Sequence, residues 1–240
     1  MELNKIYNMD CLDGFKFIQD ESVDLIVTDP PYKVTSRGNS GNSGGMLQKE
    51  INRKGDVFEH NQISSKEYLP EFYRILKNGS HCYVMTNHVN LQEMLNNSTD
   101  VGFNFIKCLI WDKGNKIMGQ YYMNQFEYIL FLRKGFGKKI NDCGTSDILK
   151  VYNDKTKNKN GDNLNDTEKP IDLMKVLILN SSKENELILD PFTGVGSTLI
   201  AAKQTKRNYI GFEIDNKYFE IAEKRLNEKE EQITLFEEAL

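Results

Sequence analysis

The sequence predicts an α/β fold with a mostly parallel sheet, and two observations carry this prediction. Short apolar runs rich in branched residues alternate with longer segments of helical periodicity along the 240 residues, a length typical of one domain (1–240). In addition, four of the runs end in an acid: Asp10, Asp29, Asp190 and Glu213. Because ligands bind beyond the carboxyl ends of the strands in such sheets, we expect these acids to share one site.

The first two expected strands flank a short helix. Residues 3–9 and 23–28 have the length and branched composition of strands, and residues 11–20 between them are expected to be helical. Residues 33–60 are polar and rich in glycine, with too few apolar side chains to pack. We therefore expect a mobile polar loop there, beside the second strand.

The middle of the chain begins with an amphipathic helix over residues 66–77, which Asn78-Gly79 would stop. A loop, residues 112–122, is expected to join the last two strands of this part. The further elements expected here are strand 80–86, helix 89–97, strand 103–111 and strand 126–132.

A second polar stretch, residues 135–166, has few candidates for the core. The alternation of helices and strands resumes after it and continues to residue 231. The elements expected there are helix 171–180, strand 186–189, helix 197–204, strand 208–212 and helix 216–231.

The composition excludes several classes of protein. With 39% apolar and 28% charged residues it is typical of a soluble globular chain, and no apolar run is long enough to cross a membrane. No secretory signal is visible, so we expect a cytoplasmic protein. The cysteines are widely separated and the three histidines lack metal-ligand spacing, which predicts reduced thiols and no metal site.

The charge is unevenly distributed although the net charge is only −4. Residues 107–160 contain eleven Lys or Arg against five Asp or Glu, whereas residues 213–240 contain four against nine. A basic middle and an acidic end fit a protein with one face for a polyanion. A merely solvated charged surface is the alternative from charge alone.

Asp29-Pro30-Pro31-Tyr32 is the first motif with chemical content. The acid can accept hydrogen bonds, the prolines stiffen the backbone and offer a carbonyl without an N–H, and the tyrosine supplies a flat face for stacking. This set suits an amino group on a planar heterocycle. Asp and Pro are also common strand terminators, so the rest of the chain must decide between the two interpretations.

The second motif runs from Asp190 to Thr198. Gly194 and Gly196 lie between a strand and a helix, where glycines let the backbone pass close to a ligand. Glu213 ends the next strand, 23 residues after Asp190, at about the offset of the acid that binds ribose hydroxyls in nucleotide-binding units. No Gly-Lys-Ser/Thr motif is present, and Asp190 would oppose a pyrophosphate. A ligand with a ribose and a cationic group, such as S-adenosylmethionine, fits better.

These motifs, in this order, resemble those of the β-class S-adenosylmethionine-dependent DNA amino-methyltransferases. The Thr-Glu-Lys-Pro sequence before the helix at 171 adds to the resemblance, which covers most of the chain except the two polar stretches. It implies a Rossmann-like methyltransferase fold with a seven-stranded sheet, helices on both faces and the last strand antiparallel. The motif order, with the catalytic half first, implies a circular permutation.

The resemblance also implies roles for individual residues. Asp29, Pro30, Pro31 and Tyr32 would form the catalytic motif. The residues implied to bind S-adenosylmethionine are Asp10, Cys11, Asp29, Thr167, Lys169, Pro170, Asp190, Phe192, Thr193, Gly194, Gly196, Ser197, Thr198 and Glu213.

The implied reaction is methylation of the N6 amino group of adenine in double-stranded DNA, after the base has been flipped out of the duplex. Asp at the head of the tetrapeptide favours adenine, whereas Ser there favours N4 of cytosine. The alternatives left open are N4-cytosine methylation, methylation of RNA or of a protein amide, and a non-catalytic nucleic-acid-binding homologue.

Loop 112–122 is the candidate for DNA contact, because it combines lysines and tyrosines with glycines. A surface hairpin whose tyrosines cover the sheet edge is the alternative. Segment 135–166 is the candidate for target recognition, and a homodimer and a cognate restriction endonuclease are open as partners. The residues expected to contact DNA are Lys113, Lys116, Tyr121, Tyr122, Lys138 and Lys139.

Overall fold

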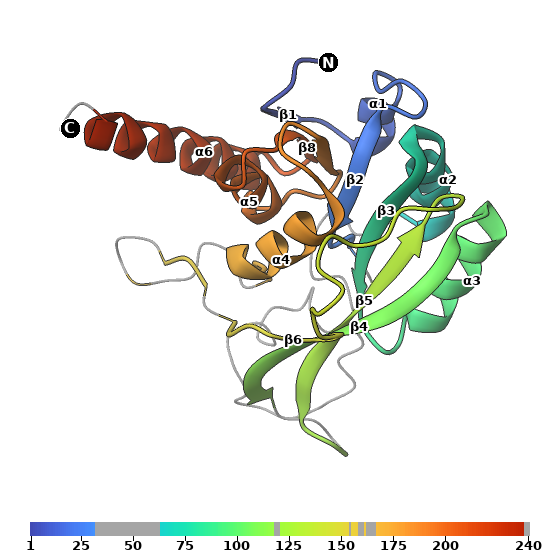
Figure 1. Cartoon of the computed structure of the whole chain (residues 1–240). Coiled ribbons are helices and arrows are strands. Elements are labelled where there is room, and N and C mark those ends of the chain that lie inside the picture. Colours follow the sequence, from blue (N-terminus) through green and yellow to red (C-terminus); the bar gives the residue numbers. More distant parts are fainter. Residues whose placement is uncertain (32–62, 118–120, 154, 158–160, 162–166, 238–240) are drawn as a thin grey trace.

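One sheet of eight strands runs through the protein, with helices on both of its faces (Figure 1). The computed structural model describes residues 1–31, 63–117, 121–153, 155–157, 161 and 167–237. The loop predicted at 33–60 lies outside these residues. Among the described helices, none is both long and apolar enough to span a membrane.

The strand order is β1-β8-β7-β2-β3-β5-β4-β6. Every neighbouring pair is parallel except those of β5, which runs antiparallel to both β3 and β4. The strands are β1 (Lys5–Asn8), β2 (Val23–Thr28), β3 (Leu76–Thr86), β4 (Asn104–Ile117), β5 (Asn124–Arg133), β6 (Ile148–Lys150), β7 (Leu187–Asp190) and β8 (Asn208–Glu213).

Two details of the expected sheet are wrong. The sheet has an eighth strand, β6, because Leu149 in the second polar stretch is buried and pairs with Trp111 of β4. The antiparallel strand is β5 and not the last strand of the chain, since β8 is parallel to both β1 and β7. The circular permutation stays a prediction.

The helices divide into two groups by the face that they cover (Figure 1). Helices α1 (Cys11–Phe15), α2 (Ser65–Ile75) and α3 (Leu91–Val101) contribute to one apolar core, with Phe15, Leu69 and Phe72 fully buried. Helices α4 (Ile171–Ser181), α5 (Ser197–Gln204) and α6 (Asn216–Glu237) contribute to the other. Burial of each such large side chain contributes about 1.5–3 kcal/mol to folding.

Strand β2 separates the two cores. Leu25 and Val27 belong to the core under α4 and α5, whereas Val23 and Ile26 belong to the core under α1 and α2. All six of its residues are buried, as expected for a central strand covered on both faces. Asp29 follows this strand directly, so the most enclosed strand of the sheet holds the first motif.

Helix α2 ends two residues before its predicted end at Lys77. Ser64 and Glu67 form a capping box at its start, which fixes the first turn. At the other end, Leu76 leaves the helix to pair with Val23 of β2 and is fully buried. Pairing with the central strand therefore prevails over the helical periodicity.

The predicted loop 112–122 is largely strand. β4 continues to Ile117 and β5 begins at Asn124, so the two strands form a long hairpin. Residues 118–120 of the predicted loop lie outside the described residues. The register shifts between Asp112 and Ile117, and this shift accommodates Gly114 at φ +73°. Polar residues therefore occupy strand positions that their composition does not predict.

Three other helices differ from their expected ends. Helix α1 stops at Phe15, five residues early. Helix α3 runs from Leu91 to Val101 instead of 89–97 and ends at Gly102, whose φ of +112° suits glycine at a helix C-terminus. Helix α6 extends to Glu237, beyond the predicted end at 231.

Candidate active site

The four predicted acids lie on four neighbouring strands at one edge of the sheet. Along the strand order, Asp10 follows β1, Glu213 ends β8, Asp190 ends β7 and Asp29 follows β2. These strands are parallel to one another, so their carboxyl ends meet at the same edge. The convergence expected from the sequence is therefore present in the structure.

Asp190 connects the two central strands of this edge. Thr28 Oγ1 donates to Asp190 Oδ1 over 2.7 Å, and the backbone N–H of Phe192 donates to the same oxygen over 3.1 Å. The side chain is almost fully buried, and this burial raises the pKa of Asp190 to about 6. Asp190 thus joins the second motif to the end of β2, directly before the first motif, and these hydrogen bonds already occupy Oδ1.

The glycine loop leads from β7 into α5. Gly194 and Gly196 have φ values of +55° and +91°, which residues other than glycine rarely adopt. A Cβ atom added at Gly196 would also lie 3.1 Å from the Cβ of Ala222 on α6. Thr193, Ser197 and Thr198 are buried beside these glycines, whereas Phe192 is half-buried and packs edge-on against Tyr68.

Glu213 faces the glycine loop across the edge of the sheet. Its Oε2 accepts the backbone N–H of Gly194 over 2.7 Å, and its Oε1 accepts that of Asp215 over 2.9 Å. Burial raises the pKa of Glu213 to about 7. Each oxygen still has lone pairs to accept a hydroxyl, so the pairing of an acid with a glycine loop fits a ribose.

Asp10 and Cys11 begin α1 at the same edge. Asp10 caps the helix by accepting the N–H of Leu12 over 2.7 Å and is half-buried. Cys11 is buried, and burial raises the pKa of its thiol to about 12. Asp10 is thus accessible to a ligand bound at the carboxyl ends of the strands, whereas Cys11 packs into the core.

Asp29 has one oxygen bound and one free. Its Oδ2 accepts from Lys169 Nζ, whereas its Oδ1 is buried and has no hydrogen-bond partner among the described residues. Burial raises the pKa of the Asp29 carboxyl, and the Lys169 ammonium opposes that shift. Pro30 is buried and Pro31 half-buried. Tyr32, the last residue of the motif, lies outside the described residues.

Two residues of this site, Glu127 and Lys113, extend the ion pair of Asp29. Lys169 Nζ lies 3.6 Å from Glu127 Oε2, and Lys113 Nζ donates to Glu127 Oε1. Glu127 is a residue that the sequence did not single out. It reaches this edge because β5 is antiparallel, which brings the beginning of β5 beside the end of β3, where Tyr128 pairs with Thr86. The sequence signal that could have identified Glu127 is an acid within an otherwise apolar strand.

Glu168 forms a second buried ion pair that the sequence analysis missed. Its Oε1 accepts from Arg225 Nη2 of α6 over 2.7 Å, and its two oxygens accept the side-chain hydroxyl and backbone N–H of Thr156, each over 2.9 Å. Arg225 Nη1 also donates to the carbonyl of Val195 in the glycine loop. We call Glu168, Arg225 and Thr156 the Glu168 clasp. It fixes the segment that carries Thr167, Lys169 and Pro170.

The residues expected to contact DNA lie in different parts of the molecule. Tyr121 and Tyr122, at the end of the β4–β5 hairpin, are 90% and 91% exposed, and Lys116 is exposed as well. Lys113 points inward to Glu127, with 13% of its side chain exposed. It is therefore part of the Asp29 network and not a surface cation.

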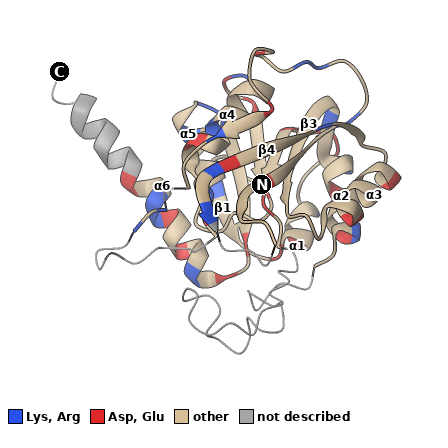
Figure 2. Cartoon of the chain, turned by 90° about the horizontal axis from the view of Figure 1, so that it is seen from below, with Lys and Arg blue, Asp and Glu red and all other residues tan. Residues whose placement is uncertain are grey.

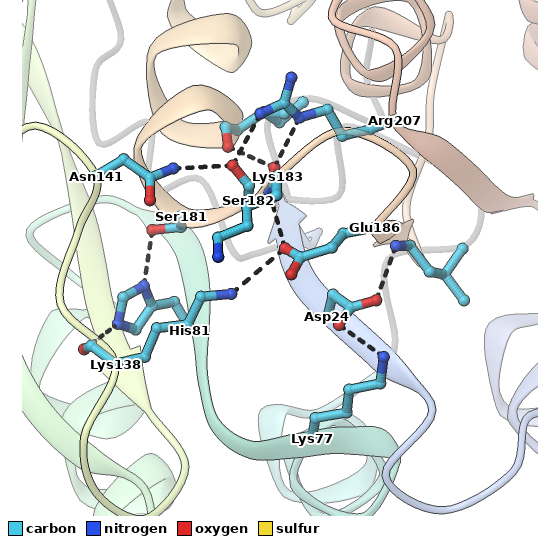
Figure 3. Close-up of polar contacts among 12 residues, drawn as sticks. Asp24, Lys77, His81, Lys138, Asn141, Ser181, Ser182, Lys183, Glu186 and Arg207 are labelled. Carbon is cyan, nitrogen blue, oxygen red and sulfur yellow. Dashed lines mark hydrogen bonds and ion pairs between the residues drawn. The ribbon is translucent and has the colours of Figure 1, made fainter.

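Lys138 and Lys139 lie at the opposite edge of the sheet. Figure 3 shows Lys138 beside His81, in the middle of β3, and Glu186, directly before β7. The Lys138 ammonium is 3.4 Å from Glu186, and its carbonyl is 3.0 Å from His81 Nε2. This position results from the return of segment 135–141 along the amino ends of the strands, and the DNA contact expected for these two lysines stays a prediction.

The basic excess of residues 107–160 does not form one uninterrupted face. Four of its basic residues pair with carboxylates of neighbouring elements: Lys107, Lys113, Lys134 and Lys138. Both signs of charge also follow each other along α6 (Figure 2). Among the described residues, no cluster of His, Cys, Asp or Glu is suited to hold a metal ion.

A comparison with protein families matches residues 23–224 to the family described as DNA methylase. Among characterised relatives, the Type II methyltransferase M.HinfI of Haemophilus influenzae is 31% identical over 94% of this chain and 69% of its own length. The Type II methyltransferase M2.DpnII of Streptococcus pneumoniae is 32% identical over 91% of this chain and 89% of its own length.

Solved structures share the fold at lower sequence identity. The M1.HpyAVI–SAM complex has a TM-score of 0.67 at 21% identity and covers 92% of this chain and 98% of that one. The cytosine-N4-specific PvuII DNA methyltransferase has a TM-score of 0.72 at 17% identity and covers 92% of this chain and 86% of that one. The α/β architecture expected from the sequence is thus that of known methyltransferases.

Proposed function

Because the chain belongs to the DNA methylase family, we propose that it transfers a methyl group from S-adenosylmethionine to N6 of adenine in double-stranded DNA. The observation that carries this proposal is the free oxygen of Asp29. Its Oδ1 is buried at the carboxyl edge, next to Pro30, without a hydrogen-bond partner among the described residues. A buried acceptor of this kind is costly unless a ligand supplies the donor. An exocyclic amino group is such a donor.

The proposed chemistry is one of orientation. The lone pair of an exocyclic amine is delocalised into the ring, which makes the nitrogen a weak nucleophile. Hydrogen bonds from the amino group to Asp29 Oδ1 and to the Pro30 carbonyl would favour a pyramidal nitrogen with an available lone pair. Positioning of this kind supplies much of the acceleration in group transfer. Asp29 is then an acceptor first, and a base only after the nitrogen has become cationic.

The residues at the carboxyl ends of β1, β7 and β8 are suited to bind S-adenosylmethionine. Glu213 keeps acceptor capacity for ribose hydroxyls, and the glycine loop lets a ligand approach its backbone. Phe192, half-exposed, offers an aromatic face, and Asp10 lies on the far side of Glu213 in the strand order. When bound, S-adenosylmethionine supplies an electrophilic methyl group on a sulfonium. The carboxylates along this edge favour such a cationic ligand.

The preference for adenine rests on the Asp that heads the tetrapeptide. N4 of cytosine is the alternative, since both bases present an exocyclic amino group of the same kind. PvuII methyltransferase, which its description gives as cytosine-N4-specific, has the same fold. The fold therefore does not discriminate between the two bases. The base that carries the new methyl group in the product identifies the target.

The DNA contact that we propose is the end of the β4–β5 hairpin. Tyr121 and Tyr122 project there almost fully exposed, and Lys116 adds a cation on the same hairpin. Exposed aromatics next to a lysine suit stacking or wedging against a duplex whose target base has been flipped out. Tyr32 is proposed to stack on the flipped base. Segment 135–166 stays the proposed recognition segment, with its described part held to β4 through β6.

The test is transfer of labelled methyl from S-adenosylmethionine to duplex DNA, followed by mass analysis of the nucleosides. We expect to detect N6-methyladenine. Detection of N4-methylcytosine instead would show that the target base is cytosine. D29A should lower the rate by at least about a thousandfold, a loss comparable to that of a key transition-state group, and leave cofactor affinity nearly unchanged. D172A is the matched control, since Asp172 is an exposed acid on α4 that pairs with Lys175. No transfer by the wild type to any duplex would refute the proposal.

Two further partners are proposed from the sequence alone. A homodimer would be seen as twice the monomer mass in solution, and a monomer would contradict it. A cognate restriction endonuclease would cleave unmethylated DNA at the site that this chain protects. Protection of methylated DNA against that enzyme is the corresponding assay.

A further inference from the structure

Lys169 is a buried cation between two carboxylates. Its Nζ donates to Asp29 Oδ2 and lies 3.6 Å from Glu127 Oε2, and it also donates to the carbonyl of Thr167 over 3.3 Å. Only 9% of the Lys169 side chain is exposed. A buried ammonium is costly without such partners, so its position depends on these acids.

We propose that Lys169 is a positioning residue for Asp29, whose ammonium holds one carboxylate oxygen so that the other, Oδ1, is presented to the target amino group. This inference rests on the proposed function and assigns the lysine a part in the same reaction. Lys169 would act through Asp29 and would not itself touch the reacting atoms. It differs from the role that family resemblance gives Lys169, which is contact with the cofactor.

The charges around Asp29 explain why a cation is needed there. Asp29 and Glu127 both approach Lys169, and the second carboxylate disfavours the ionised form of the first. Lys113 pairs with Glu127, and its charge also lowers the pKa of Asp29, but less than the charge of Lys169 does. Without Lys169, Lys113 would be the only one of these two cations left to oppose burial and the Glu127 charge, so Asp29 would take up a proton more readily. A protonated carboxyl is a poorer acceptor for an amino group.

The backbone around Lys169 is held in place by contacts with α6 and with the glycine loop proposed to bind the cofactor. The preceding residue, Glu168, belongs to the Glu168 clasp, which holds α6 and the carbonyl of Val195 in the glycine loop. Glu168 and Lys169 therefore bind opposite parts of the site with adjacent side chains. Pro170 follows immediately as the N-cap residue of α4, and its ring limits the backbone there. The position of the ammonium at Asp29 is thus tied to the loop proposed to bind the cofactor.

The experiment compares pH profiles of kcat with cofactor affinity. We would prepare K169M, which removes the cation while keeping a flexible chain of similar length, and E127Q, which removes the competing carboxylate. K169R is the conservative variant, and K175M is the matched control, since Lys175 is a lysine of α4 that pairs with exposed Asp172. Single-turnover methyl transfer would be measured between pH 5.5 and 9, and binding of S-adenosylmethionine by calorimetry.

The two variants should shift the acidic limb of the profile in opposite directions. In K169M we expect the limb to move up by about one pH unit or more, with kcat at neutral pH lowered about tenfold or more. In E127Q it should move down, and K169R should retain part of the wild-type profile. The dissociation constant for S-adenosylmethionine should change by less than about threefold in K169M, which is under 1 kcal/mol in binding.

Two results would overturn the inference. The first is a K169M enzyme whose profile is unshifted but whose cofactor affinity is lost, because Lys169 would then bind the cofactor. The second is a limb that moves the same way in K169M and E127Q, which would indicate a general structural effect. Failure of the proposed function is a separate outcome, since it would appear as a wild-type enzyme without transfer. Should K169M fail to fold, K169R decides: a partly shifted limb with unchanged cofactor affinity supports the inference, and an unshifted limb with lost cofactor affinity overturns it.

Discussion

Glu168→Ala tests whether the Glu168 clasp stabilises the fold. The Glu168 side chain is 2% exposed and that of Arg225 is 11% exposed, so the ion pair is shielded from water. Alanine would remove the acceptor of one guanidinium bond and two bonds from Thr156, and would leave Arg225 without its carboxylate. Removing one partner of a buried pair costs about 3–5 kcal/mol. For a chain of this size such a loss corresponds to a fall in Tm of roughly 10 °C.

Urea unfolding followed by fluorescence of the single tryptophan, Trp111, measures this cost. The control is R74M, because Arg74 also pairs with acids but has 32% of its side chain exposed on α2, and a weaker loss is expected. A double variant, E168M/R225M, should recover part of the stability, since an apolar pair can replace a buried ion pair. A loss below about 1 kcal/mol in E168A would refute the reasoning.

Two further predictions concern His81 and the hairpin. Burial lowers the pKa of His81 to about 4, below its unfolded value of about 6.5, so the unfolded chain binds the proton more readily between these values. The stability of the wild type relative to H81Q should therefore fall between pH 6.5 and 4, by up to about 3 kcal/mol in urea titrations, and a pH-independent difference would contradict this. Y121A/Y122A should weaken binding of duplex DNA about tenfold or more in a fluorescence titration, with cofactor binding as the control that stays unchanged, and equal affinity would exclude the hairpin as a contact.

Much of the fold and half of the site follow from local sequence. Strand β2 is a short, mostly apolar run. Gly194 and Gly196 have a spacing typical of a loop that a ligand approaches closely. Both positions could therefore be predicted. The convergence of Asp10, Asp29, Asp190 and Glu213 followed from one rule on parallel sheets. These predictions succeeded because each depends on a few adjacent residues.

The remainder depends on pairing between distant segments. Nothing near Glu127 indicates that β5 runs antiparallel, and only that direction brings Glu127 and Lys113 to Asp29. The Glu168 clasp joins residues up to 69 positions apart, such as Thr156 and Arg225. The lysines of a basic segment cannot be divided into paired and free ones before the elements that carry their partners are placed. For the same reason the pairing of Lys138 with Glu186 could not be predicted.

The strand order also has a consequence for the way the chain folds. β2 lies between β3, which follows it within 50 residues, and β7, which comes 160 residues later. Such a distant pairing carries a high loop-closure cost and is completed late. During synthesis, β2 would wait with one edge unpaired until residue 190 has left the ribosome. Only then can Thr28 bond to Asp190, so the site cannot be complete before β7 has been synthesised.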